Sequence, residues 1–276
     1  MRFRFAALLL APLLGPLASA DAADLGSVRT MRFGAPDPAT YVVTVTANAQ
    51  AIPRFPGSDQ FTGIYYPSIN IRPANEAPRF AAPDDGFSIN VLEEIPEVRF
   101  GPVLRLQGGR YRSDDRRLFG IHKINVGIEP GGFVEFYPVS FIRARLELRY
   151  GFNGGEGIVG NAGVDFIAPV GRFTLSVGPR VAFADAHYMR DYFGVRPIEA
   201  ALNGFLPAYR PGGGLMSAGV LGAVSYRWND TWSTTGYVGY NRLVDEAARS
   251  PIPRRIGSLD QLTFGASVSY SFNFTP

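Results

Sequence analysis

Apolar and polar residues alternate along several stretches of this chain with a period of two. In the stretch 141–152, FIRARLELRYGF, the even-numbered positions are apolar or aromatic and positions 143, 145, 147 and 149 are charged. On a helix these charges would surround the cylinder, whereas on a strand they gather on one face. The stretches 173–184 and 262–274 repeat the alternation. The pattern therefore predicts β-strands with one apolar and one polar face.

Eight weaker stretches show the same alternation, so the sequence predicts eleven strands. Bacterial single-chain barrels have an even number of strands. We therefore expect about twelve, with a short twelfth strand near Arg79–Ala82, and ten as the nearest alternative. The eleven predicted strands are Tyr41–Gln50, Ile64–Arg72, Phe87–Leu92, Val98–Gln107, Val126–Tyr137, Phe141–Phe152, Ile158–Ala168, Phe173–Ala184, Met216–Trp228, Trp232–Leu243 and Leu262–Phe274.

The polar faces of these strands favour a membrane barrel over a soluble sandwich or barrel. A soluble sheet turns Lys and Glu to water, whereas here the polar face carries Gly, Ser, Thr, Asn and clustered Arg. Several strands reach the ~9–11 residues that a tilted strand needs to cross the hydrocarbon. We expect an all-β, transmembrane, antiparallel up-and-down β-barrel whose aromatic girdle draws on Tyr65, Tyr66, Tyr137, Tyr150, Tyr226, Trp228, Trp232 and Tyr240.

The N-terminus has the features of a secretory signal peptide. Arg2 and Arg4 precede an apolar core at 6–14, and Ala18-Ser19-Ala20 forms a small-x-small cleavage site. The apolar run is shorter than the roughly 20 residues of a membrane-spanning helix. We expect residues 1–20 to be a signal peptide, 21–40 a loose periplasmic leader and 41–276 the barrel of an outer membrane.

The predicted connections between strands are of two lengths. The junctions at Gly171-Arg172 and Asn229-Asp230 are short, as periplasmic turns are. Four longer connections contain Pro, Gly and charged residues, which is typical of external loops. They are Pro73–Asp85, Arg110–Asn125, Asp185–Gly214 and Asp245–Gln261.

The composition holds few groups for catalysis. The chain has no Cys, which excludes disulfides and thiolate chemistry, and its two histidines, His122 and His187, both fall in predicted loops. The formal net charge of +3 is too small to indicate a nucleic-acid partner. We expect no enzyme activity, no metal and no cofactor.

Clustered arginines are the strongest candidates for a functional surface. On a strand, they and nearby carboxylates face the predicted lumen, where rings of charge can select ions. A second interpretation, which we favour, is that the arginines pair with Glu147, Asp165 and Glu135 and fill a narrow bore. The lumen-facing candidates are Arg99, Arg105, Arg143, Arg145, Glu147, Arg149, Asp165 and Arg180.

Two loop segments are candidates for contacts outside the lumen. Tyr188, Tyr192 and Phe193 fit a short amphipathic turn packed on the barrel mouth, or an exposed contact for a partner; packing is the interpretation we favour. Arg249 opens a basic, Pro-rich segment, RSPIPRR, that could meet anionic groups or remain a solvated loop.

A series of short motifs runs through nearly all of the mature chain. The motifs are Pro53-x-Phe55-x-Gly57-Ser58-Asp59, Phe100-Gly101-Pro102-Val103-Leu104-Arg105, Gly108-Gly109-Arg110, Gly178-Pro179-Arg180, Asp185-x-x-Tyr188-x-x-x-Tyr192-Phe193-Gly194-Val195, Ser250-Pro251-Ile252, Gly257-Ser258-x-x-Gln261-Leu262 and Ser267-Val268-Ser269-Tyr270-Ser271-Phe272. In this order and at these separations they resemble the MipA/OmpV family of outer-membrane proteins. This chain has Arg249 where the family usually has an acidic residue before Ser-Pro-Ile.

The resemblance implies a non-enzymatic scaffold, because one branch of the family brings a lytic transglycosylase together with a murein synthase in peptidoglycan synthesis. It assigns no role to single residues. The luminal arginines support a second hypothesis, a narrow channel for small anionic solutes. An outer-membrane hydrolase is a third and weaker hypothesis, since no catalytic spacing supports it.

Overall fold

The computed structural model describes residues 40–75, 78–91, 95 and 97–275. The fold described below belongs to the unit Ala39–Pro276. The expected signal peptide and all of the expected leader except Thr40 lie outside the described residues.

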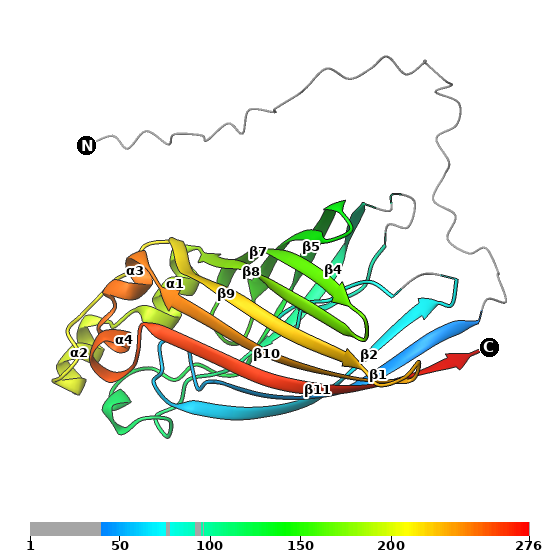
Figure 1. The fold of residues 1–276 in the computed structure, drawn as a ribbon. Helices are drawn as coiled ribbons and strands as arrows, with labels where there is room; N and C mark the ends of the chain where they lie inside the picture. Colours follow the sequence, from blue (N-terminus) through cyan, green and yellow to red (C-terminus); the bar gives the residue numbers. More distant parts are fainter. Residues whose placement is uncertain (1–39, 76–77, 92–94, 96, 276) are drawn as a thin grey trace, which may run out of the picture. The chain divides into compact units, whose positions relative to one another are not determined.

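Eleven strands of the described residues form one antiparallel sheet in the order β2-β1-β11-β10-β9-β8-β7-β6-β5-β4-β3. Strand β1 pairs with β11, so the first and last strands lie side by side in a barrel wall (Figure 1). All eleven predicted strands are present. Their bounds are β1 Tyr41–Pro53, β2 Phe61–Pro73, β3 Phe87–Ser88, β4 Val98–Gln107, β5 Gly127–Val139, β6 Ile142–Gly151, β7 Gly157–Val170, β8 Phe173–Ala184, β9 Gly214–Arg227, β10 Trp232–Leu243 and β11 Asp260–Phe274.

Burial follows the sequence alternation strand by strand. On β6, Arg143, Arg145, Glu147 and Arg149 are buried, while Leu146 and Leu148 are exposed. The polar face therefore lines the lumen, and the apolar face forms the outer surface. This is the reverse of a soluble core, and it is the arrangement of a barrel in lipid.

The two ends of the barrel differ in the length of their connections. At one end, the turn end, β5 joins β6, β7 joins β8 and β9 joins β10 through short turns, and β1 begins and β11 ends there. At the other end, the cap end, the longer connections form a 3₁₀ turn and four short helices (Figure 1). The helical segments are η1 Arg116–Leu118, α1 Ala186–Phe193, α2 Pro197–Asn203, α3 Asp245–Arg249 and α4 Pro251–Ile256.

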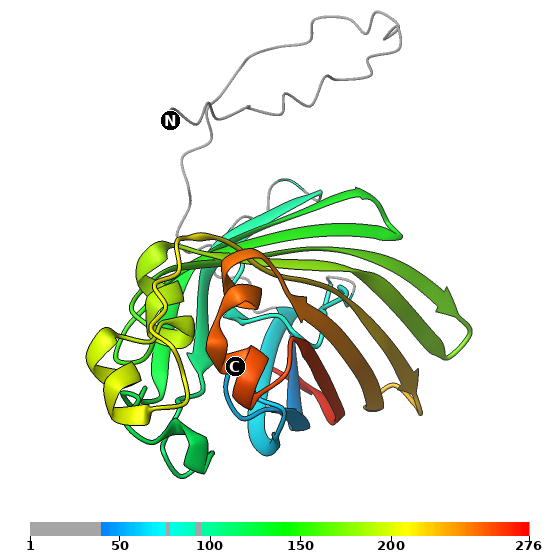
Figure 2. The ribbon, with the colours of Figure 1, turned by 90° about the vertical axis from the view of Figure 1, so that its left-hand side faces the viewer.

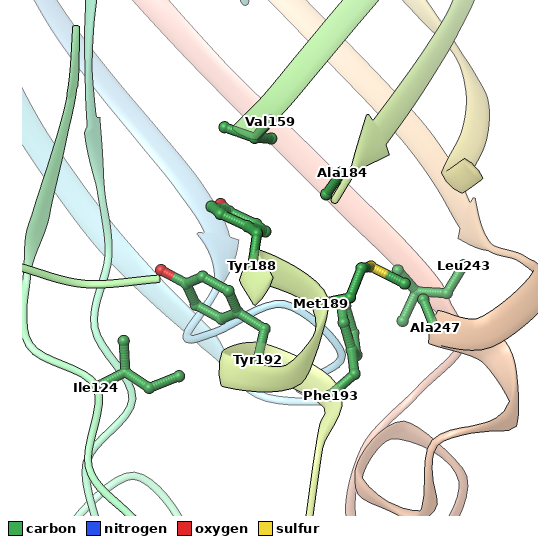
Figure 3. Close-up of a cluster of buried hydrophobic side chains, with 9 residues drawn as sticks. All are labelled: Ile124, Val159, Ala184, Tyr188, Met189, Tyr192, Phe193, Leu243 and Ala247. Atoms are coloured by element: carbon green, nitrogen blue, oxygen red, sulfur yellow. The ribbon is translucent and has the colours of Figure 1, made fainter. Parts of the chain in front are cut away.

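The helices of the cap end lie in front of the strands when the barrel is viewed from that end (Figure 2). Asp185 begins α1, because its carboxylate accepts hydrogen bonds from the backbone N–H groups of His187 and Tyr188. Helix α1 then carries its aromatic side chains into an inner cap cluster (Figure 3). This cluster consists of Ile124, Val159, Ala184, Tyr188, Met189, Tyr192, Phe193, Leu243 and Ala247.

An outer cap cluster joins connections that are far apart in the sequence. It brings Phe55, from the β1–β2 connection, against residues of the β4–β5, β8–β9 and β10–β11 connections. The cap therefore holds the β1–β2 corner to the β4–β5 corner without strand pairing. The members are Phe55, Leu118, Ile121, Val195, Leu206, Ile252 and Ile256.

The twelfth strand that we expected near Arg79–Ala82 is not a strand. The chain leaves β2 at the turn end, and Gly86 reaches Glu147, in the middle of β6, before β3 begins. The described residues of Ala74–Gly86, here the inserted segment, thus enter the lumen. Asp85 and Asp84 of this stretch pair with Arg143 and Arg180 on the inner face of the wall, which holds the stretch inside the lumen.

The inserted segment also corrects one predicted loop. Pro73–Asp85 starts at the turn end, opposite to the three other long connections, and therefore does not belong with them as an external loop. Two residues that we expected in the aromatic girdle lie on the luminal side of the wall instead of the outer surface. Tyr137 donates a hydrogen bond to the carbonyl of Phe80 in the inserted segment, and Tyr66 shares the luminal face of β2 with Ser68.

Candidate functional site: the charged lumen

A continuous charged surface covers the luminal face of β4 to β8. On β6 the register places Arg143 opposite Asp165 of β7 and Arg145 opposite Glu135 of β5. The period of two thus brings acidic and basic positions of neighbouring strands onto one face. This charged wall consists of Arg99, Arg105, Glu129, Glu135, Arg143, Arg145, Glu147, Arg149, Asp165 and Arg180.

Arg143 lies at the centre of the wall. Its guanidinium donates to Asp165 Oδ2 at 2.8 Å and to Glu135 Oε1 at 3.0 Å. Arg145 also pairs with Glu135, and its Nη2 lies 2.8 Å from Glu147 Oε1. Planar guanidinium groups can serve several carboxylates at once, which suits a dense buried network.

The other arginines extend the network toward both ends. Arg149 donates to Glu147 Oε2 at 2.6 Å and to Glu129 Oε2 at 3.1 Å, and Arg105 lies 3.0 Å from Glu147 Oε2. Arg180 pairs with Asp165 at 2.6 Å. Arg99 reaches Glu135 at 3.7 Å. All eight predicted lumen-facing residues therefore lie on this one wall.

The inserted segment adds two carboxylates that sequence analysis did not assign to the lumen. Asp85 Oδ2 accepts from Arg143 at 2.6 Å, and Asp84 Oδ2 accepts from Arg180 at 2.8 Å. The backbone N–H of Gly86 donates to Glu147 Oε1 at 3.0 Å. These contacts attach the segment to the middle of the charged wall.

Charge balance explains why the segment is held there. The wall has six arginines and four carboxylates, and Asp84 and Asp85 bring the carboxylates of this cluster to six. A buried cluster with two uncompensated positive charges would be costly in a medium of low dielectric constant. The inserted segment therefore acts as a built-in anionic ligand of the wall.

The opposite wall, formed by β9 to β11 with β1 and β2, carries hydroxyl groups along its middle, and its charged residues lie near strand ends: Arg72, Arg227, Arg242 and Asp260. Its hydroxyl groups pair across strands, with Thr44 Oγ1 at 2.8 Å from Ser271 Oγ and Thr46 Oγ1 at 2.8 Å from Ser269 Oγ. These side chains are half-buried, whereas the central charged wall is buried. The lumen thus has a closed charged side and a looser side lined by hydroxyls.

Helix α1 connects the cap to the charged wall. The hydroxyl of Tyr188 donates to Glu129 Oε1 at 2.9 Å. Burial, followed by the charge of Glu129, raises the pKa of Tyr188 well above its usual value, so the hydroxyl stays protonated and donates. The buried Arg110 donates to the carbonyl of Tyr192 at 2.6 Å. Tyr188, Tyr192 and Phe193 are thus buried in the inner cap cluster, as in the packing interpretation that we favoured, and none of the three is the exposed contact of the alternative.

A second polar cluster lies within the cap. Glu199 accepts from the Nη2 of Arg196 at 2.7 Å, and its Oε1 lies 2.8 Å from His122 Nδ1. Burial alone would raise the pKa of Glu199, but hydrogen bonds from Arg196 and the charge of His122 lower it to about 2. The other ring nitrogen of His122 lies 3.1 Å from the carbonyl of Asp191. This cluster joins two loops of the cap.

The remaining candidates lie at the surface of the cap. Arg249 is exposed and pairs with Glu246 at 2.6 Å within α3. His187 is exposed near the start of α1. Within the described residues, no group of three or more His, Asp or Glu side chains is placed to hold a metal ion. No helix of the described residues is long and apolar enough to cross a membrane.

The outer surface shows the signature of lipid contact. Large apolar side chains stay exposed on the outward face of the strands, among them Leu148, Phe166, Val177 and Val238. Near the turn end, aromatic rings of neighbouring strands touch one another in a belt. This belt includes Phe173, Tyr226, Trp228, Trp232 and Tyr270.

An apolar exterior with an aromatic belt and a polar, charged interior defines a transmembrane β-barrel of the bacterial outer membrane. The sequence matches the family model described as MltA-interacting protein MipA over residues 45–272, and the chain belongs to this family.

Solved structures match this chain over most of its length at low sequence identity. The KdgM porin has 11% sequence identity and a TM-score of 0.40, and the match covers 83% of this chain and 99% of the porin. An outer membrane channel from Pseudomonas putida F1 has 8% identity and a TM-score of 0.44, covering 90% of this chain and 100% of the channel. A comparison with curated proteins gave no match.

Proposed function

We propose that this chain is an outer-membrane barrel with a filled lumen that acts by binding other envelope proteins, as a non-enzymatic scaffold. The observation that carries the proposal is the pairing of the luminal arginines with carboxylates of the wall and of the inserted segment. Paired charges fill a bore and leave little field to attract a solute. The helices packed in the mouth support the same proposal.

The turn end is the side that we assign to the periplasm, because short turns face the periplasm in barrels of this class. A protein that binds cell-wall enzymes would meet them there. The family description names an interaction with MltA, and the resemblance of the sequence predicts a lytic transglycosylase and a murein synthase as partners. We propose that the barrel holds these two enzymes together.

A narrow channel for small, anionic solutes is the second candidate. It is favoured by the half-buried hydroxyl wall, whose side chains bond to each other rather than to the charged wall. A path along this wall would pass beside the arginines of the network. The two candidates differ in one measurable property, the conductance of the unmodified barrel.

Planar-bilayer recording of the purified barrel tests the closed lumen. The scaffold proposal predicts no ohmic steps, whereas anion-selective steps that disappear in Arg143→Ala or Arg145→Ala would contradict it. Because these buried arginines also stabilise the fold, Arg99→Ala serves as a milder variant, since its ion pair is long and partly exposed. Steps that lose anion selectivity in Arg99→Ala would favour the channel.

A binding experiment tests the scaffold itself. The barrel in detergent is mixed with a purified lytic transglycosylase and a purified murein synthase, and the complexes are isolated on a tag carried by the barrel. Retention of both enzymes is the expected result. Failure to retain either enzyme under conditions in which the barrel is folded would contradict the scaffold role.

A further inference from the structure

The outer face of the barrel wall is hollowed across β7 to β10, which lie side by side (Figure 1). Val224 and Val238 face outward there and are exposed. Gly222 and Gly236 lie two residues from them on the same strands and therefore face the same way. Because these glycines have no side chain, an open groove of about 970 Å³, here the outer groove, remains between larger neighbours. Its lining includes Leu175, Val177, Gly222, Val224, Gly236 and Val238.

The outer groove lies within one leaflet of the membrane. Strands β8 and β10 begin at the turn end; Leu175 is two residues from the start of β8, and Val238 is six residues from the start of β10. At ~3.3 Å per residue, the groove therefore lies about 7–20 Å from that end along the strands. The hydrocarbon of a bilayer is ~30 Å thick, and barrel strands are tilted in it. The groove thus faces the acyl chains of the leaflet at the turn end.

The chemistry of the outer groove favours a hydrocarbon chain over a peptide. Strands β7 to β10 are each paired on both sides, so their backbone groups bond within the wall. The outward side chains that line the groove are apolar. An extended peptide placed there would leave its own N–H and C=O groups unsatisfied in hydrocarbon, which is costly. An acyl chain has no such groups.

Two arginines lie at the turn end of β8 and β9, next to the outer groove. Arg227 N donates to the carbonyl of Arg172 at 2.9 Å, so the two residues lie opposite each other. Arg172 also donates to the carbonyl of Trp228 at 3.2 Å. Neither arginine forms an ion pair with Asp230 of the adjacent turn or with any other described carboxylate. Like charges directly opposite each other destabilise a strand pair, and an anion between them would offset that cost.

The register of β8 and β9 connects these arginines to the outer groove. Next to the arginines, Phe173 lies opposite Tyr226, and their ring centroids are 4.7 Å apart. The next outward pair, Leu175 and Val224, lines the groove. From the turn end inward, the β8–β9 pair thus presents cations, then an aromatic pair, then an apolar groove. A phospholipid presents its phosphate, its glycerol esters and its acyl chains in the same order.

We propose that the β8–β9 pair is a binding site for one phospholipid, with its phosphate between Arg172 and Arg227 and its acyl chains in the outer groove. Guanidinium groups form strong, often bidentate hydrogen bonds with phosphate oxygens. The alternation turns both arginines toward the inner face, but the wall ends there, and these long, exposed side chains can reach a phosphate at the membrane surface. The groove volume is at the upper end of the ~300–1,000 Å³ of small-molecule pockets.

Fluorescence quenching of the purified barrel in detergent tests the site. In Trp232→Phe, here the reporter barrel, Trp228 is the one remaining tryptophan, and its ring lies 4.6 Å from that of Tyr226. The probe is phosphatidylglycerol with brominated acyl chains, which quench at contact. We expect quenching that saturates at one lipid per barrel. Diacylglycerol with the same chains has no phosphate and should bind about tenfold more weakly, the effect of losing one charge-assisted hydrogen bond.

Filling the outer groove tests where the acyl chains lie. In the reporter barrel, Gly236→Leu places a side chain in the groove without a clash, because nothing lies within 4 Å of a Cβ there. The affinity for phosphatidylglycerol should fall about tenfold, the effect of excluding about two methylene groups. Gly222→Leu is a second variant, in which the nearest atom to the Cβ is a carbonyl oxygen at 3.9 Å. Gly132→Leu, outward on β5 and outside the groove, is the control and should bind as the reporter barrel does.

Removing one cation tests the position of the phosphate. Arg227→Gln in the reporter barrel removes a guanidinium whose side chain makes no hydrogen bond among the described residues. The affinity for phosphatidylglycerol should fall about tenfold, whereas that for diacylglycerol should not change. Arg249→Gln, an exposed arginine of the cap end, is the control and should leave both affinities unchanged.

Four outcomes would overturn the inference. They are quenching that does not saturate near one lipid per barrel, equal affinity for phosphatidylglycerol and diacylglycerol, affinity that both glycine variants leave unchanged, and a fall in Gly132→Leu as large as in Gly236→Leu. A barrel that is dimeric in detergent and becomes monomeric in Gly236→Leu would also overturn it, because a second copy would then occupy the outer groove.

Discussion

Replacing Asp85 by Asn is the most direct test of how the inserted segment is held. The carboxylate of Asp85 lies 2.6 Å from Arg143 Nη2 and 3.5 Å from Arg145 Nε. The side chain of Arg143 is 1% exposed and that of Asp85 16% exposed, so water screens this pair weakly. Asn preserves the shape of the side chain and removes its charge.

The expected loss of stability is about 3 kcal/mol. Removing one partner of a buried ion pair costs about 3–5 kcal/mol, because the other charge stays buried without compensation. The lower end applies here, since Arg143 keeps Glu135 and Asp165 as partners. Asp84→Asn should cost about 1 kcal/mol or less, because the side chain of Asp84 is 38% exposed.

Urea unfolding of the barrel in phospholipid vesicles measures these differences, with the fluorescence of Trp228 and Trp232 as the signal. Asp59→Asn is the matched control: its pair with Arg117 spans 3.8 Å and both side chains are 45% exposed, so the expected change is below about 0.5 kcal/mol. If Asp85→Asn behaves like Asp59→Asn, the wall does not hold the segment by charge and our reasoning is refuted.

Three further predictions concern the wall and the cap. Gly178→Ala should sharply reduce the fraction of barrel that migrates as folded on a cold SDS gel, because a Cβ there would lie 1.6 Å from the carbonyl oxygen of Val164. Gly236→Ala is the control and should assemble normally, because nothing lies within 4 Å of a Cβ at that position. Ile252→Ala should lower the free energy of unfolding by about 2–5 kcal/mol, because the side chain is fully buried; proteolysis of the cap loops at the unmutated rate would contradict this. The folded-state pKa of Glu199, about 2, is lower than its ordinary value of 4.5, so the contribution of Glu199 to stability is complete above pH 4.5 and disappears as the pH falls through about 2. The melting-temperature difference between wild type and Glu199→Gln should follow that course. A difference that stays constant with pH would refute this prediction.

The alternation of residue types was enough to locate the strands. Val98–Gln107, Phe173–Ala184 and Trp232–Leu243 have the bounds that the pattern predicts, because side chains two residues apart share a face wherever one face meets lipid. The same rule placed Arg143, Arg145 and Arg149 on the luminal face. The pattern predicted the positions of aromatic residues less well, because tyrosines such as Tyr66 and Tyr137 are amphipathic and can lie on either face of the wall.

The inserted segment could not be predicted in the same way. Its two aspartates, Asp84 and Asp85, are adjacent and therefore do not follow a period of two. They hold the segment by pairing with arginines that are up to 96 positions away in the sequence. A signal was present, since the wall has more arginines than carboxylates and therefore requires anions from elsewhere. Sequence alone did not show that Asp84 and Asp85 supply them.

The sequence by itself determined that this chain is a barrel, which residues face the lumen and which face lipid, because those properties depend on neighbours two positions away. Tertiary structure decided which arginine meets which carboxylate, and that the stretch after β2 enters the lumen. Those features depend on the register of distant strands and on the balance of charge in a closed interior. No local pattern of residues records either of them.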